Sequence, residues 1–237
     1  MNSVPATNID AAWLVGLLQA GDSFYPTGSF AHSFGLEGLV QEGVIRDRAT
    51  LREFLFRSVL PSLRQSELPL AAHAWQAVAA GDWMRVGELC RLSAALKAPQ
   101  EIRTASANIG RQRAELTALL HSHLLAQEYL RRATEEGWPH SAAVSSALEG
   151  RVLGAPRVAM LAGVYYASTA SLLSAAMKVL RLGQNAAQSL LTEALAAAPG
   201  IIATAEQVPL DEIGWFNPWL DIAAARHETT GSRMFIS

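Results

Sequence analysis

The sequence has a single cysteine, Cys90, among its 237 residues, which excludes an internal disulfide and fits a reducing cytoplasm. Net charge is also low, at −2 from 19 basic and 21 acidic residues, so no overall field would attract nucleic acid or an anionic membrane. Aromatic residues are only 7% of the chain, and β-branched residues are sparse beside alanine and leucine, which favours helices over sheets. We therefore expect an all-α, cytoplasmic protein that binds neither nucleic acid nor a membrane.

The sequence also lacks the common motifs of catalysis. It contains no Gly-x-x-x-x-Gly-Lys-Ser/Thr phosphate-binding loop and no Gly-x-Ser-x-Gly nucleophile elbow. His121 and His123 are two residues apart and would point to different sides of a helix, while His227 and Glu228 are adjacent. Neither pair has the spacing of a stable metal site. We predict no nucleotide site, no tightly bound metal or cofactor, and no enzymatic activity.

The most unusual stretch lies near the start, over 21–37, and reads GDSFYPTGSFAHSFGLE. An apolar helix is expected before it, over 10–19. Pro26 fixes one backbone angle and Gly28 can take a positive one, so together they indicate a tight turn. Ser29 would then cap a second helix that continues to about position 42.

Two interpretations of this corner remain open. In one, it is an ordinary connection between two helices whose aromatic residues fill the core. In the other, the corner displays Tyr25, His32 and Glu37 for recognition of a partner.

Several further helices follow from capping and turn signals. Thr50-Leu51-Arg52-Glu53 has the form of a capping box and predicts a helix that ends near Pro61. Loops are expected at 137–139 and at 154–156, where glycine and proline cluster. The other expected helices cover 69–80, 82–96, a long one with Pro99 in its first turn, 141–148, and a long apolar one ending near Arg181.

One segment raises the possibility of a membrane span. No formal charge occurs from Val158 to Met177, and the run is long enough to cross a bilayer. It is nevertheless rich in Ala, Ser, Thr and Gly, so its mean transfer energy is modest. We interpret it as a buried central helix, with a membrane-embedded component as the alternative.

Cys90 is the one candidate thiol nucleophile, because it is the only cysteine. It lies in an alternating charged and apolar segment that suggests a half-buried helix face, where a free cysteine usually acts as a small hydrophobe. The principal alternative function is a stand-alone helical-bundle enzyme resembling TenA-type thiamin-degrading proteins, with Cys90 as nucleophile.

Four separated motifs are similar, in order, to those of the urease accessory protein UreF family. The first comprises Leu17-Leu18-Gln19, Asp22-Ser23, Pro26-x-Gly28-Ser29-Phe30 and His32-Ser33-Phe34-Gly35-Leu36-Glu37. The second is Glu101-x-Arg103-x-x-Ser106-x-x-x-Gly110-Arg111, and the third is Leu182-Gly183-Gln184-x-x-x-Gln188-x-Leu190-Leu191. The fourth runs from Pro218-x-Leu220-Asp221-Ile222-Ala223 through Arg226-His227-Glu228-Thr229 to the closing Ser232-Arg233-Met234-Phe235-Ile236-Ser237.

The resemblance implies a single helical domain over 1–237, a multi-helix bundle with a flexible segment over 1–8 and a docking tail over 229–237. It implies a homodimer that acts as a non-catalytic adaptor between UreD, also called UreH, and the GTPase UreG, in the delivery of nickel to apo-urease. Nickel would be handled by the assembled complex, with transient contacts possible at His32 and His227. The tail departs from the family pattern, because Met234 replaces a leucine and Ile236 replaces an arginine.

The residues that match the motifs are the expected partner interface. They are Tyr25, Pro26, Gly28, Ser29, His32, Ser33, Phe34, Gly35, Glu37, Arg103, Ser106, Gly110, Gln184, Gln188, His227, Glu228, Arg233, Phe235 and Ser237. Our hypothesis is that the corner, the face of the helix that carries Arg103, and the tail converge on one composite surface, with the tail ordered by UreD.

Overall fold

The computed structural model describes residues 11–28 and 35–216, and this part of the chain is helical with no β-strand. The all-α expectation is therefore confirmed. The segments over 1–8 and 229–237, to which flexibility and docking were assigned, lie outside the described residues. One hydrophobic core extends from Leu36 to Ile213 and collects side chains from helices throughout the chain.

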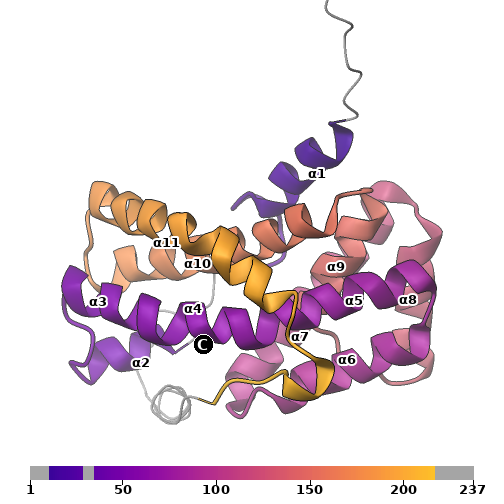
Figure 1. Cartoon of the computed structure of the whole chain (residues 1–237), viewed down its shortest axis with the longest axis horizontal. Coiled ribbons are helices and arrows are strands. Elements are labelled where there is room, and N and C mark those ends of the chain that lie inside the picture. The colour runs from indigo at the N-terminus through magenta and orange to yellow at the C-terminus, as the bar shows by residue number, and fades with distance from the viewer. Residues whose placement is uncertain (1–10, 29–34, 217–237) are drawn as a thin grey trace, which may run out of the picture.

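From α2 onward the helices follow one another with short connections (Figure 1). The first half of the chain contains α1 Ala12–Gly21, α2 Leu36–Gln41, α3 Arg48–Phe54, η2 Leu55–Val59, α4 Leu60–Ser62, η3 Leu63–Glu67, α5 Leu68–Ala80 and α6 Trp83–Ala95. The second half contains α7 Gln100–His121, α8 Leu124–Glu135, α9 Ala142–Val152, α10 Arg157–Val179, α11 Gln184–Ala205 and the 3₁₀ turn η4 Leu210–Glu212.

The prediction of separate helices ending near Pro61 and beginning at Pro69 was wrong. The elements α3, η2, α4, η3 and α5 form one uninterrupted helical run, which crosses the middle of the view in Figure 1. A proline inside a helix lacks a donor and its ring crowds the preceding turn. Here a wider π turn comes before each proline, closed by the Leu60 N–H on the Leu55 carbonyl and by the Leu68 N–H on the Leu63 carbonyl. These wide turns let the helix continue past both prolines.

The start of that run was also placed too late. The N-cap is Asp47, whose side chain accepts a 2.8 Å hydrogen bond from the Thr50 backbone N–H. Thr50 closes the capping box from the N3 position, since its hydroxyl oxygen accepts a hydrogen bond from the Asp47 backbone N–H. Thr50 is thus part of the capping box, as predicted, but it occupies the N3 position and not the N-cap. The helix begins at Arg48.

Helix α9 is more enclosed than α10, the helix that contains Val158–Met177. Seven of the eleven residues of α9 are buried, against nine of the twenty-three in α10. Helix α9 packs against both α5 and α7 and also contacts α6, α8 and α10. Its composition of Ala, Ser, Val and Gly explains this, because small side chains allow neighbouring helices to approach on several sides.

Helices α10 and α11 are both long and apolar enough to cross a membrane by length and composition alone. In their most apolar windows, 44% of the α10 residues and 28% of the α11 residues are buried inside the structure. The two helices pack against each other, and α10 also contacts α1, α2, α5 and α9. Much of α10 is thus a core helix, as the sequence indicated for this segment.

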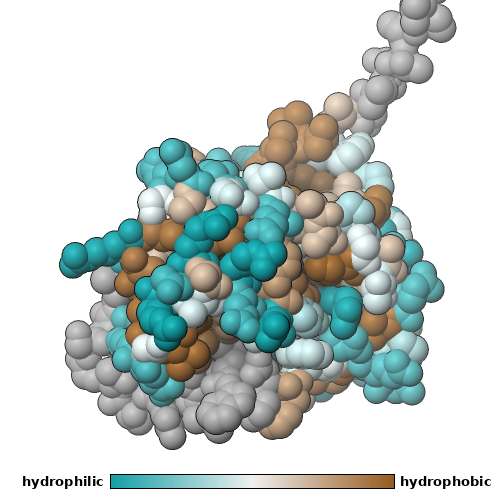
Figure 2. All heavy atoms as spheres, turned by 60° about the vertical axis from the view of Figure 1, so that its left-hand side comes forward, coloured by the Kyte–Doolittle hydropathy of each residue, from teal (hydrophilic) through white to brown (hydrophobic). Residues whose placement is uncertain are grey.

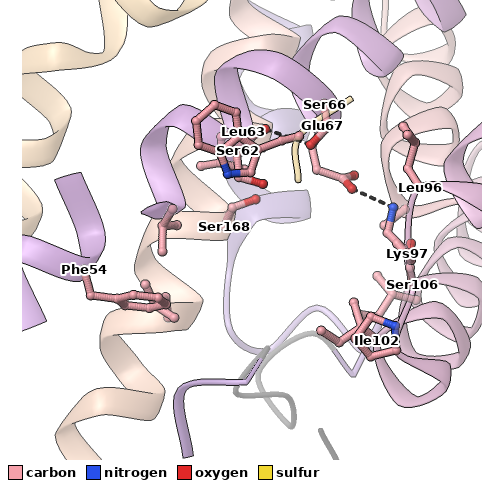
Figure 3. Close-up of a pocket in the computed structure, with 16 residues that line it drawn as sticks. Phe54, Ser62, Leu63, Ser66, Glu67, Leu96, Lys97, Ile102, Ser106 and Ser168 are labelled. Atoms are coloured by element: carbon pink, nitrogen blue, oxygen red, sulfur yellow. Dashed lines mark hydrogen bonds and ion pairs between the residues drawn. The ribbon is translucent and has the colours of Figure 1, made fainter. Parts of the chain in front are cut away.

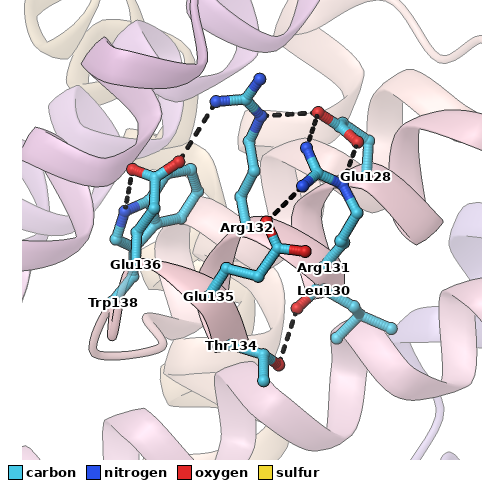
Figure 4. Close-up of polar contacts among 8 residues, drawn as sticks. All are labelled: Glu128, Leu130, Arg131, Arg132, Thr134, Glu135, Glu136 and Trp138. Carbon is cyan, nitrogen blue, oxygen red and sulfur yellow. Dashed lines mark hydrogen bonds and ion pairs between the residues drawn. The ribbon is translucent and has the colours of Figure 1, made fainter.

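A network of charged residues covers the outer side of α8 (Figure 4). Glu128 accepts hydrogen bonds from both Arg131 and Arg132, and these hydrogen bonds lower the pKa of Glu128 to about 2. The network continues to Glu136, which accepts a 3.0 Å bond from the indole N–H of Trp138. It therefore ties the exposed face of α8 to the loop at 137–139, which the structure places where it was predicted.

Candidate functional site

The corner after α1 begins as predicted, with a tight turn. The Tyr25 N–H donates to the Asp22 carbonyl at 3.0 Å, and the Thr27 N–H donates to the Tyr25 carbonyl at 2.8 Å. Gly28 adopts φ 78°, a left-handed conformation that side chains rarely tolerate. The turn therefore leaves Pro26 and Gly28 exposed while it directs Tyr25 and Thr27 inward.

Tyr25 is held inside the protein. Its hydroxyl donates a 2.7 Å hydrogen bond to the Glu149 carboxylate of α9, and the side chain is only 7% exposed. Burial, and then the nearby Glu149 carboxylate, raise the pKa of Tyr25 well above its usual value, so the hydroxyl remains a donor. The interpretation in which the corner displays Tyr25 is not supported, since this aromatic side chain fills the core.

The same carboxylate pairs with Arg113 of α7 in a buried salt bridge. The guanidinium of Arg113 lies 5.6 Å from the centre of the Tyr25 ring and also donates, at 3.5 Å, to the Ala20 carbonyl near the end of α1. Its Nε atom is buried and has no hydrogen-bond partner among the described residues. One buried cluster of Tyr25, Arg113 and Glu149 thus joins α1 and the corner to α7 and α9.

Sequence reasoning missed Arg113 and Glu149. Arg103, Ser106 and Gly110 were placed on one face of α7, and the same three-and-four spacing continues to Arg113 and Thr117. Glu149 is the one acidic residue in α9, and this isolated charge among small and apolar residues was a signal of its own. Following this face of α7 for two more turns would have indicated a row of polar side chains, which need polar partners when they are buried.

The face of α7 that carries Arg103 turns inward. Arg103 donates to the Lys97 carbonyl at 2.7 Å and to the Ala98 carbonyl at 3.2 Å, and so binds the connection that follows α6. Ser106 and Gly110 are buried. A Cβ atom on Gly110 would lie 2.5 Å from the backbone of Ser141, so this glycine permits the close approach of α7 to α9. A role for these residues at a partner interface stays a prediction.

Helix α2 begins at Leu36, and Gly35, with φ 85°, is its N-cap. The predicted helix start at Ser29 lies outside the described residues. Glu37 is only 5% exposed, so its side chain is not displayed either. Ser29, His32, Ser33 and Phe34, and the tail residues His227, Glu228, Arg233, Phe235 and Ser237, lie outside the described residues.

The remaining predicted positions are on the surface. Gln184 is the first residue of α11, and Gln188 lies one turn later. Both are exposed, as their spacing of four on one face allows. Whether they contact a partner stays a prediction.

A cavity of about 230 Å³ lies between the π turns and the start of α7 (Figure 3). Its wall is mainly apolar, with contributions from Leu63, Ile102 and Leu172. At one side, Lys97 donates a 2.7 Å hydrogen bond to Glu67. Both π turns contribute lining residues, in keeping with the frequent use of such turns to aim side chains at sites. The cavity has the size and surface to hold apolar groups.

Cys90 is fully buried in α6, away from this cavity's lining. Its sulfur lies 3.7 Å from the Tyr129 hydroxyl, whose oxygen is in turn 3.3 Å from Nδ1 of His140. Burial raises the pKa of the Cys90 thiol to about 12. A buried thiol that holds its proton is a poor nucleophile.

We therefore expect Cys90 to be nearly inert in the folded protein. At pH 8 its thiolate fraction should be about a thousandfold lower than that of an ordinary cysteine. Labelling with a chromogenic disulfide should be correspondingly slow, and the same protein in urea should react at the rate of a free thiol. Rapid labelling of the native protein would contradict this expectation and favour the alternative function, an enzyme with Cys90 as nucleophile.

Apolar residues gather on α1, which projects from the body in Figure 1 and is the hydrophobic prominence beside the grey segment in Figure 2. Leu14, Val15 and Leu18 are 45–67% exposed, and Phe24 in the corner is 93% exposed. Within the described residues no group of three or more His, Cys, Asp or Glu side chains is placed to hold a metal ion. The large exposed side chains named above for α1 and the corner are apolar, and the polar residues Asp22 and Ser23 are exposed between them.

Comparison with known proteins identifies the family of this chain. The model of the UreF family matches residues 45–195, which is more than half of the chain. The chain belongs to the UreF family. The expected resemblance is confirmed over the region that contains Arg103, Gly110, Arg113, Glu149 and the glutamine pair of α11.

Individual UreF proteins extend the similarity over the full length. A urease accessory protein UreF of Chromohalobacter salexigens is 33% identical over 237 residues, which is all of both chains. UreF of Methylibium petroleiphilum is 31% identical and covers 98% of each chain. UreF of Kocuria rhizophila is 31% identical, over 95% of this chain and 97% of its own. The UreF similarity thus includes the corner, which precedes the segment matched by the family model.

Proposed function

We propose that this UreF-family protein is a non-catalytic adaptor in urease maturation. It bridges UreD (UreH) and the GTPase UreG, so that nickel is inserted into apo-urease in a GTP-dependent step. The observation that carries this proposal is the end-to-end similarity to proteins named urease accessory protein UreF. In this role nickel is cargo of the assembled complex, and the adaptor works in the cytoplasm as a homodimer.

The geometry supports a scaffold more than an enzyme. The nucleophile that the alternative requires is buried, and its raised pKa keeps it protonated. Among the described residues, Arg113–Glu149 is the most buried ion pair, and Glu149 also accepts the hydrogen bond of the Tyr25 hydroxyl in the corner. Such a pair holds a surface in place, as an adaptor requires, because partners recognise a preorganised surface at lower entropic cost.

Co-purification tests the proposal. The tagged chain would be expressed with the UreD and UreG of its host and isolated in the presence of GDP or of a non-hydrolysable GTP analogue. We expect UreD to be retained, and UreG to be retained only when UreD is present. If neither protein is retained by a folded, tagged chain, the adaptor function is wrong.

Deletion of residues 232–237 should abolish the retention of UreG. The tail carries a charged residue, Arg233, and an aromatic residue, Phe235, two positions apart in the sequence, and these residue types often anchor an interface. We expect UreG content to fall about tenfold or more, as for the loss of a dominant interface contact. The matched variant Ile236→Arg, which restores the family residue, should retain at least as much UreG as the original chain. Unchanged retention by the truncated chain would remove the tail from the mechanism.

A further inference from the structure

The attachment of α1 to the body is unusual for so short a helix. Only Ala20 of its ten residues is buried, so hydrophobic packing contributes little to its position. Helix α1 packs against α10, and Gly16 allows a close approach to Leu153, since a Cβ atom there would lie 2.6 Å from the Leu153 side chain. Two hydrogen bonds also hold α1 and the corner. Arg113 donates to the Ala20 carbonyl, and the Tyr25 hydroxyl donates to the Glu149 carboxylate.

The platform for these contacts is a closely packed pair of helices. Arg113 comes from α7 and Glu149 from α9, two helices that pack closely through Gly110. Both side chains are buried, at 11% and 3% exposure. In a site of low dielectric a charged hydrogen bond is strong, and its loss leaves a charge without a full set of partners. The corner is therefore tied to two helices that pack extensively against each other.

We propose that Tyr25, Arg113 and Glu149 form a lock that holds α1 and the corner in the position from which the adaptor recognises its partners. In this arrangement Tyr25 is a positioning residue that acts from inside the fold, and it is not itself a contact residue. The exposed residues that it positions are Pro26, Gly28 and the projecting Phe24. This inference rests on the proposed function for its last step only, since the lock itself can be tested without a partner.

The lock has a quantitative consequence for binding. If partners bind only the locked arrangement, apparent affinity falls in proportion to the fraction of molecules that are locked. Removal of the tyrosine hydroxyl alone weakens the lock. It should raise the equilibrium constant for opening of the segment 12–28 roughly tenfold, as expected for the loss of one buried hydrogen bond. Removal of the whole ring also abolishes the contact with the Arg113 guanidinium and should leave the segment largely open.

The test uses the variants Tyr25→Phe and Tyr25→Ala of the full chain. Amide hydrogen exchange followed by mass spectrometry should show faster exchange over 12–28 in Tyr25→Phe, and faster still in Tyr25→Ala, while peptides of α5 and α6 stay protected. Tyr165→Phe is the matched control. It removes an equally buried hydroxyl hydrogen bond, 2.6 Å to the Ala194 carbonyl, between α10 and α11, and should leave 12–28 unchanged.

The same variants are then titrated with UreD of the host. Affinity should fall at least tenfold for Tyr25→Ala, with Tyr25→Phe in between and Tyr165→Phe equal to the original chain. The lock is refuted if exchange over 12–28 does not change, or if all peptides open equally. Selective opening without loss of affinity refutes the positioning role. If the original chain does not bind UreD, the proposed function fails, and hydrogen exchange alone decides whether the lock exists.

Discussion

Replacement of Gly110 by valine is expected to destabilise the protein by about 3 kcal/mol or more. A Cβ atom at this position would lie 2.5 Å from the Ser141 carbonyl carbon and 2.7 Å from the Ser141 nitrogen. Both are backbone atoms and cannot rotate away, so α7 and α9 would have to separate. Urea denaturation followed by circular dichroism at 222 nm would show a much lower midpoint.

Gly163→Ala is the matched control for Gly110. Gly163 is also a helix-interior glycine, but nothing lies within 4 Å of its Cβ position. Alanine there should raise stability by about 0.5–1 kcal/mol, since it favours the helix and meets no obstacle. A Gly110→Val protein that unfolds at the same urea concentration as the original chain would show that α7 and α9 are not packed this closely.

The second large effect is expected at Glu149. Glu149→Ala should destabilise the fold by about 3–5 kcal/mol, because it leaves the buried Arg113 guanidinium without its counter-charge. The substitution also removes the acceptor of the Tyr25 hydroxyl. The free energy of unfolding from urea denaturation measures the sum of the two losses.

Two variants separate the buried charge from other causes. Glu193→Ala removes a carboxylate that pairs with Arg52 at the surface, and should change stability only slightly, because exposed ion pairs contribute little. The double variant Arg113→Met, Glu149→Leu removes both buried charges and should recover much of the loss seen in Glu149→Ala. If Glu149→Ala is as mild as Glu193→Ala, the salt bridge does not contribute to the fold as described.

Much of the helical architecture could be predicted from the sequence, because caps and breakers act locally. Asp82 was expected to cap α6, and its side chain accepts a hydrogen bond from the Arg85 N–H. The errors arose where one local sequence signal was compatible with two different structures. Pro61 was taken as the end of one helix and Pro69 as the start of the next, but a π turn before each proline lets the helix continue, and no residue type encodes a π turn by itself.

The site was harder to predict, because its residues meet through tertiary packing. Tyr25 and Glu149 are 124 residues apart in sequence, and spacing along the chain carries no information on such a contact. The corner was recognised as special from its composition, yet whether Tyr25 and Glu37 point outward depended on what lay beneath them. Likewise α9 gave no family signature, although its small residues suit it to the centre of the bundle.

The most direct test of the central claim is complementation of a urease-producing host that lacks its own UreF. The measured quantities are urease activity and nickel bound per urease active site, with the expression of this chain verified. We predict that the chain restores both quantities, and that Cys90→Ser restores them equally well. A folded, expressed chain that restores neither nickel content nor activity would contradict a role in urease maturation.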